Sequence, residues 1–321
     1  MNIKFKKKSF FFKLLSKVNN SKQSIFLKKG WIIKLINQEN YEGFGEVSPL
    51  CNSHIFECSK QLNQIPSDID KNNLLEIIKK FHPCVQSGIN SALAELEGKF
   101  KFKENYNFNH INQSAILLNS ESVLRELEIL KKNKSFKKEQ LTIKWKVAIY
   151  DNKIEEKLLE EILNMISSNI RLRIDANGSW NKNCAYRWAE ILKDSKNLDW
   201  LEQPLHVDDI EGLKELGGKI PVALDESLIK YPNLHKSWGG WQIRRPSQES
   251  NPLKLQKELN EKLSFRSISS SFETGIGRRM LYHFSNLQLL GPTPKVPGLA
   301  LKQTPKNSLF VDKPSSIWEH L

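Results

Sequence analysis

The sequence predicts an α/β fold in which parallel strand–helix units close into a barrel behind a smaller α+β domain. Three short apolar runs, at 171–175, 198–202 and 221–225, each end on an acidic residue. Counted from Lys146, the successive intervals to these acids are 29, 27 and 23 residues, the length of one strand, one crossover helix and their loops. Because a closed parallel barrel presents the carboxyl ends of its strands on one face, we expect the side chains to meet at one mouth.

Residues 1–110 predict the α+β domain, because strand-like runs come first and helical patterns follow. The expected strands cover 2–12, 30–36 and 43–47, and the expected helices cover 71–82 and 87–100. The third strand ends at the turn signal Ser48-Pro49.

From residue 111 to about 305, strands and helices alternate as parallel βα units do. The expected strands lie at 115–118, 141–147, 171–175, 198–202, 221–225, 240–245 and 266–271. The helical patterns lie at 121–132, 152–167, up to 188, 208–216, 252–262 and 277–287. This count predicts a modified (β/α)8 TIM-type barrel, written (β/α)7β. The tail at 306–321 is too short for a domain, and we expect it to pack on the first one.

Composition indicates a globular protein, with 39% hydrophobic and 26% charged residues among 321. No run approaches the roughly 18 consecutive apolar residues that span a bilayer. The patch at 10–12, behind a basic N-terminus, is too short for a signal-peptide core. We therefore expect a cytoplasmic protein with reduced cysteines.

The formal charge of +13 would suit a nucleic-acid partner or the steering of a small anionic substrate. The lysines are spread along the whole chain, without the clustered basic and aromatic residues typical of single-strand binders. We expect a small anionic substrate and no nucleic acid, with a nucleic-acid-binding protein as the alternative from another class. The sequence does not indicate the oligomeric state.

Lys144 and Lys146 are two residues apart on one predicted strand, so their side chains point the same way and Trp145 points the other. Two ammonium groups held close repel each other, and we expect the pKa of at least one to fall toward the range of a general base. A single Lys-x-Lys pair is usually found exposed on an edge strand. The acids on the following strands are what favour a catalytic pair.

Asp175, Glu202 and Asp225 would offer the all-oxygen ligand set that Mg²⁺ prefers. A lysine base beside such a cation is suited to removing a proton α to a carboxylate, because the cation offsets the charge that develops on the oxygens. The sequence therefore predicts a magnesium site at the mouth of the barrel.

Five stretches in this order resemble the enolase superfamily, in its muconate-lactonizing branch. They are Lys144-x-Lys146, Arg173-Ile-Asp-Ala-Asn-Gly, Trp200-Leu-Glu-Gln-Pro, Leu224-Asp-Glu-Ser and the run 269–277. The Ser-Ser-Ser-Phe-Glu-Thr segment of the last run resembles the o-succinylbenzoate synthase family. The run 43–49 is similar to the specificity loop of the superfamily's capping domain, so the resemblance covers nearly the whole chain.

The resemblance implies that Lys146 is the base, that Lys144 tunes it, and that the three acids bind Mg²⁺. It also implies supporting and substrate-binding residues, which are Asn177, Glu226, Arg173, Ser270 and Gly298. For Arg173, a salt bridge to a neighbouring strand is an equal alternative. The implied reaction is the syn-dehydration of 2-succinyl-6-hydroxy-2,4-cyclohexadiene-1-carboxylate to 2-succinylbenzoate, in menaquinone or phylloquinone biosynthesis.

Arg245 departs from the family, which usually has a lysine on the sixth strand just before a proline. Arginine stays protonated and cannot act as a base. A racemase or epimerase needs a base on each face of its substrate, whereas a syn-dehydration needs one. Arg245 therefore favours the dehydratase, with its cation stabilising charge. The alternative is an N-succinylamino-acid racemase or a dipeptide epimerase of the same superfamily.

Overall fold

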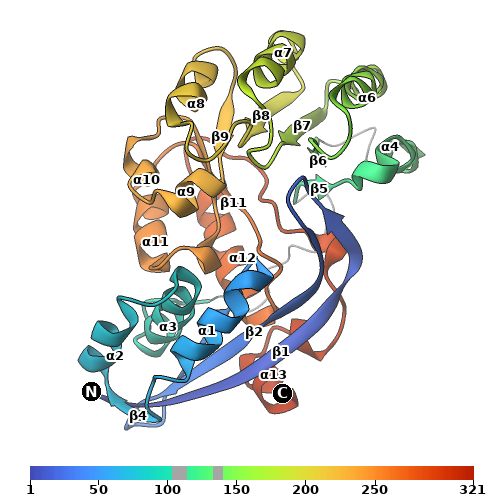
Figure 1. The fold of residues 1–321 in the computed structure, drawn as a ribbon. Coiled ribbons are helices and arrows are strands. Elements are labelled where there is room, and N and C mark those ends of the chain that lie inside the picture. Colours follow the sequence, from blue (N-terminus) through green and yellow to red (C-terminus); the bar gives the residue numbers. More distant parts are fainter. Residues whose placement is uncertain (103–113, 133–139) are drawn as a thin grey trace.

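The computed structural model describes residues 1–102, 114–132 and 140–321, and these residues form two sheets (Figure 1). One is antiparallel with the strand order β3-β2-β1-β4, and the other is parallel with the order β11-β10-β9-β8-β7-β6-β5. The predicted fold class is confirmed. The expected limit between the two domains, at residues 110 and 111, lies outside the described residues, so it stays a prediction.

A long hairpin forms the antiparallel sheet of the N-terminal part, which we call the cap. Its strands are β1 (Asn2–Asn19), β2 (Ser24–Ile36), β3 (Glu42–Val47) and β4 (Asp68–Asp70), and its helices are α1 (Ile55–Leu62), α2 (Lys71–Ile78) and α3 (Pro83–Leu96). The strand β1 runs beyond the expected end at residue 12. Its inward residues Leu14 and Val18 continue the alternation and pack with Ile25 of β2.

The C-terminal tail contacts the face of the cap sheet that the cap helices leave free. The ring of Phe310 meets Phe12 edge to face at 4.9 Å between centroids. Farther on, α13 (Pro314–His320) is held where Lys8 Nζ donates to the carbonyl of Trp318 at 2.8 Å. Both chain ends therefore lie at the cap end of the molecule (Figure 1).

Glycines allow β3 and α3 to touch backbone to backbone. A Cβ on Gly45 would lie 1.8 Å from the carbonyl oxygen of Gly88, closer than any real contact. We expect Gly45→Ala to force strand and helix apart and to lower the free energy of unfolding by about 1–3 kcal/mol, as overpacking does. Urea unfolding would measure it. Gly239→Ala is the matched control, because its Cβ would meet no atom within 4 Å; equal losses in both variants would contradict the close approach.

Seven parallel strands line the barrel, and helices cover them outside (Figure 1). The strands are β5 (Ile116–Leu117), β6 (Leu141–Lys146), β7 (Ile170–Asp175), β8 (Leu198–Glu202), β9 (Val222–Leu224), β10 (Trp241–Arg244) and β11 (Arg266–Ile268). The helices are α4 (Val123–Lys132), α6 (Asn152–Met165), α7 (Lys182–Leu192), α8 (Ile210–Gly217), α9 (Glu226–Lys230), α10 (Leu234–Ser237), α11 (Pro252–Asn260) and α12 (Gly275–Leu289). Trp145 faces outward, as expected, and lies 5.9 Å from the ring of Trp188 on α7.

The segment 297–299 joins the two edges of the parallel sheet. On one side Gly298 N donates to Ile268 O, and Ser270 N donates to Gly298 O, both at 2.8 Å. On the other side Ala115 N donates to Pro297 O at 2.8 Å, and Leu299 N donates to Ser114 Oγ at 2.9 Å. This segment therefore takes the eighth place in the ring, the final strand of the (β/α)7β pattern.

All four cysteines of the chain are free thiols. Cys58 and Cys84 are buried, in the manner of small apolar side chains. Among the described residues, no helix is long and apolar enough to cross a membrane.

Candidate active site

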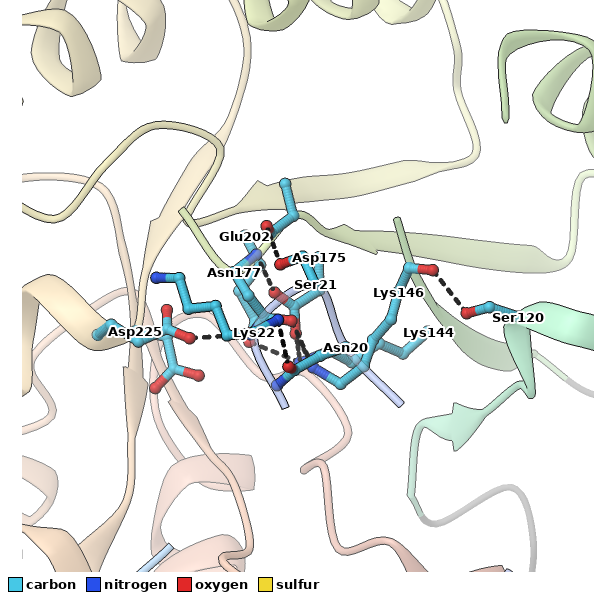
Figure 2. A network of polar contacts seen from close by, with 12 residues as sticks. Asn20, Ser21, Lys22, Ser120, Lys144, Lys146, Asp175, Asn177, Glu202 and Asp225 are labelled. Carbon is cyan, nitrogen blue, oxygen red and sulfur yellow. Dashed lines mark hydrogen bonds and ion pairs between the residues drawn. The ribbon is translucent and has the colours of Figure 1, made fainter. Parts of the chain in front are cut away.

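The two lysines of β6 point into the barrel mouth and reach the acids of the next strands (Figure 2). Lys146 Nζ lies 2.6 Å from Asp175 Oδ2 and 3.0 Å from Asn177 Oδ1. Lys144 Nζ lies 2.9 Å from Asp175 Oδ2 and 2.5 Å from Glu202 Oε1. The structure thus brings together the lysine pair and two of the predicted acids.

Strand register explains why these side chains meet. Lys146 pairs with Asp175 across β6 and β7, and Asp175 pairs with Glu202 across β7 and β8. In parallel strands, residues in register project from the sheet at the same height, so the three side chains share one level of the mouth. Asp225 follows directly on β9 and stands at the N-terminus of α9.

Arg245, just after β10, holds Asp225 in a fork. Its Nε lies 2.8 Å from Oδ1, and its Nη2 lies 2.6 Å from Oδ2. The Nη1 group donates to the carbonyl oxygen of Ser270. Burial alone would lower the pKa of Arg245, but the charge of Asp225 outweighs it and raises this pKa. The side chain is therefore a fixed cation and no base.

Asn177 links Lys146 to Glu226. Its backbone adopts a left-handed φ of 47°, and its Nδ2 donates to Glu226 Oε1 at 2.8 Å while its Oδ1 accepts from Lys146. Burial, followed by the like charges of Asp225 and Asp175, raises the pKa of Glu226 to about 7. Near neutral pH this carboxyl therefore carries less negative charge than an ordinary glutamate.

The acids reverse the expected effect of lysine–lysine repulsion at Lys144. Burial lowers the pKa of Lys144, but Asp175 and Glu202 outweigh burial, and the net shift is upward. The expected lowering is therefore wrong for Lys144, because the acids lie closer than the sequence alone could show. Conversely, although burial would raise the pKa of Asp175, the two lysines hold it well below its usual range.

The side chains of Arg173 and Ser270, predicted to bind substrate, form hydrogen bonds with other residues of the protein. Arg173 Nε lies 3.2 Å from Asp199 Oδ2, and its Nη2 donates to Val296 O at 2.8 Å. The salt bridge that was an equal alternative in the sequence analysis is thus present, and the second bond ties Arg173 to the residue just before the segment 297–299. The Ser270 hydroxyl donates to Glu273 Oε2 at 2.7 Å.

A cavity of about 380 Å³ opens between the barrel mouth and the cap. It is lined by ten of the eleven residues singled out from the sequence, namely Lys144, Lys146, Arg173, Asn177, Glu202, Asp225, Glu226, Arg245, Ser270 and Gly298. The eleventh, Asp175, is fully buried beneath the lysines. The sequence-derived set therefore surrounds a single cavity.

Cap residues that the sequence did not single out line the same cavity. The hairpin tip supplies Lys22, which lies with Ser21 at the barrel mouth (Figure 2). A hydrogen bond of 2.6 Å between the hydroxyls of Ser21 and Ser179 fastens this tip to the loop after β7. His54 and His82 line the cap side, with ring nitrogens 3.1 Å apart. No local motif marks these residues, because only the docking of cap on barrel brings them there.

Gln203 is a second kind of residue that the sequence analysis passed over. Its Oε1 accepts from the backbone N–H groups of Asp225 and Ser227 at 3.1 and 3.0 Å, and its Nε2 donates to the Ser227 hydroxyl at 2.7 Å. It ties the loop after β8 to the loop after β9. Its place directly after Glu202, within one of the quoted motifs, was the signal that could have identified it.

The three acids have the donor chemistry that a divalent metal requires, since all offer carboxylate oxygens. In this conformation each faces a cation instead: Asp175 and Glu202 face Lys144, and Asp225 faces Arg245. In residues 1–102, 114–132 and 140–321, no three His, Cys, Asp or Glu side chains are arranged to hold a metal ion. A shared ion would require these pairs to rearrange, and the metal site stays a prediction.

Comparison with known proteins finds a family that matches part of the barrel and relatives that match more of the chain. Residues 131–237 match the family described as Enolase C-terminal domain-like. A relative, o-succinylbenzoate synthase of Thermosynechococcus vestitus, is 25% identical over 273 residues, which is 80% of each chain. The L-Ala-D/L-Glu epimerase of Bacillus subtilis is 32% identical over 91 residues, which is 27% of this chain and 25% of the relative.

Solved structures share the whole fold. O-succinylbenzoate synthase from Thermosynechococcus elongatus, complexed with Mg in the active site, superposes with a TM-score of 0.76 at 22% identity, covering 99% of this chain and 100% of that one. A dipeptide epimerase from Cytophaga hutchinsonii, complexed with Mg and a dipeptide, gives 0.74 at 17% identity, covering 96% and 88%. These structures show the shared fold, and together with the family match at 131–237 and the relative that covers 80% of the chain they confirm the resemblance to the enolase superfamily.

Proposed function

We propose that this chain, an enolase-superfamily enzyme by its barrel, is a magnesium-dependent o-succinylbenzoate synthase. It would dehydrate 2-succinyl-6-hydroxy-2,4-cyclohexadiene-1-carboxylate to 2-succinylbenzoate. Support comes from the relative with this activity that spans 80% of both chains, whereas the epimerase of Bacillus subtilis matches only 27% of this one.

One observation carries the choice of reaction: Lys146 and Arg245 stand on opposite sides of the cavity. With the segment 297–299 in the eighth place, the parallel sheet forms a ring of eight places. The strands β6 and β10 are four places apart in this ring, so they lie opposite each other. A substrate between them meets an amine on one face and a guanidinium on the other. Only the amine can accept a proton, so the site suits a reaction that needs a base on one face of the substrate.

The charges of the site suit a dianion. Lys144, Lys146 and Arg245 balance the three acids Asp175, Glu202 and Asp225, and the raised pKa of Glu226 leaves it partly neutral. A bound divalent cation would leave an excess of two positive charges while Lys146 is an ammonium group, and of one while it is the neutral base. The site is therefore positive in both states, which suits a substrate with two carboxylates, one on the ring and one on the succinyl chain.

Lys146 would act on the ring carbon that bears the carboxylate. As a neutral amine it takes the α-proton, and as an ammonium group it then returns a proton to the hydroxyl that leaves from the neighbouring carbon. The C–O bond breaks, water departs, and the new double bond completes the aromatic ring. Asp175 and Asn177, which accept hydrogen bonds from Nζ at 2.6 and 3.0 Å, would orient the lysine for both transfers.

Asp175, Glu202 and Asp225 would hold the metal. When bound, it would supply positive charge next to the substrate carboxylate, which makes the α-proton easier to remove. Lys144 would keep this end of the cavity positive, and Arg245 would stabilise negative charge from the opposite face. Lys22 of the cap lines the cavity and offers a further cation to the substrate.

The alternative is an N-succinylamino-acid racemase or a dipeptide epimerase. A short match supports it, since a hydrophobic dipeptide epimerase is 43% identical over 67 residues. These residues are only 20% of this chain, and Arg245 removes the second base that such a reaction needs.

The direct test is conversion of the cyclohexadiene substrate by the purified protein, with 2-succinylbenzoate identified by chromatography and mass. We expect turnover with Mg²⁺, loss of turnover with excess EDTA and recovery when Mg²⁺ is added back. N-succinyl amino acids and dipeptides are assayed in parallel. Epimerisation of these compounds without any dehydration would overturn the proposal in favour of the alternative.

A further inference from the structure

Asp225 is bound differently from the other two acids of the site. Arg245 occupies both of its oxygens, through Nε at 2.8 Å and Nη2 at 2.6 Å, and both side chains are at least nine-tenths buried. The guanidinium is also anchored by its bond to the carbonyl of Ser270. A planar fork that is fixed at a third point holds a carboxylate in one orientation.

Lysines bind the other two acids, without the planar fork that holds Asp225. A lysine is a point charge on a flexible stem, and it can move aside without breaking a planar pairing. Glu202 has one oxygen near Lys144 and the other at 3.4 Å from Trp200 Nε1, a long hydrogen bond. Of the three proposed metal ligands, Asp225 is therefore the one that would resist transfer to a metal.

We infer that Arg245 competes with the divalent cation for Asp225, so that loading of the site depends on what Arg245 binds. The inference rests on the proposed function and adds a control on metal binding. An anionic ligand that accepts the guanidinium hydrogen bonds would free Asp225 for the cation. Metal and anionic ligand would then strengthen each other's binding, as thermodynamic linkage requires.

Calorimetric titration of the intact protein with Mg²⁺ tests this. Arg245→Lys keeps the positive charge but cannot form the fork, so we expect its Kd for Mg²⁺ to fall by about tenfold or more relative to the unmutated protein, as lost charge-assisted hydrogen bonds predict. Arg266→Lys is the matched control. Arg266 bonds Glu258 at 3.2 Å and does not line the cavity. The Kd of the Arg266→Lys protein for Mg²⁺ should equal that of the unmutated protein.

A second measurement needs no variant. In the unmutated protein, saturating 2-succinylbenzoate should tighten Mg²⁺ binding, and if Arg245→Lys folds, the gain there should be smaller. Equal Mg²⁺ affinity in the unmutated and Arg245→Lys proteins, or no tightening by 2-succinylbenzoate, overturns the competition while leaving the proposed function in place. No Mg²⁺ binding to either protein, even with 2-succinylbenzoate, overturns the metal-dependent function itself.

Discussion

Lys146→Ala is expected to lower kcat for dehydration by at least a factor of about 10²–10⁴, the usual contribution of one general acid–base group. The loss should be at the upper end, because the same amine takes the α-proton and returns a proton to the hydroxyl. KM should change little if the side chain acts on the reacting atoms and not in binding. Steady-state kinetics on the cyclohexadiene substrate would measure both.

The protein should remain folded in this variant. Truncation removes one partner of buried Asp175, but Lys144 Nζ, 2.9 Å from the same oxygen, still pairs with it. A thermal melt checks the fold. Lys157→Ala, on the exposed side of α6, is the matched control and should keep normal kinetics. Near-normal turnover in folded Lys146→Ala would refute the role of this residue.

Proton exchange in heavy water should be confined to one enantiomer of an N-succinyl amino acid. The guanidinium of Arg245 stays protonated near neutral pH and cannot take the proton from the second face. The structure strengthens this reason, because the charge of Asp225 raises the pKa of this guanidinium further. We expect exchange at the α-carbon to differ between the enantiomers by about 100-fold or more, as followed by mass spectrometry.

Arg245→Lys separates charge from basicity in this experiment. It keeps the cation and should retain dehydration within a modest factor, although the planar stacking surface is lost. Its slower enantiomer should exchange faster than in the unmutated protein, because lysine can accept a proton. Equal exchange from both enantiomers in the unmutated protein would reveal a second base and defeat the dehydratase-only interpretation.

Alternation along strands and the order of βα units made the barrel and its acidic mouth predictable from local sequence. Lys144 and Lys146 had to share one face because they are two residues apart, and Trp145 had to pack outside. Asp175 and Glu202 had to lie at one end because parallel strands share a direction. The early end predicted for β1 was wrong because the polar residues Lys13, Ser16 and Lys17 obscured the alternation of the inward residues Leu14 and Val18.

Pairings between distant residues were beyond local sequence. The bond from Arg173 to Asp199, the fork of Arg245 on Asp225 and the closing place of 297–299 depend on separations that the fold alone sets. The pKa shift of Lys144 was equally beyond local sequence, because it depends on distances that the fold sets. Like charge on Lys144 and Lys146 predicted a lowered pKa, but the energy between charges falls with distance, and the acids came closer than any sequence pattern indicates.

By itself, then, the sequence determined which residue types stand at the strand ends and on which face, because strand geometry is a property of neighbours along the chain. The tertiary structure decided which charges pair, which hydroxyls are already bonded and which cap residues, such as Lys22, reach the cavity. Those outcomes depend on how two sheets dock and how one ring closes. Contacts of that kind join residues that are far apart in the sequence: Glu46 and Thr274 are 228 positions apart, and Lys8 and Trp318 are 310 apart.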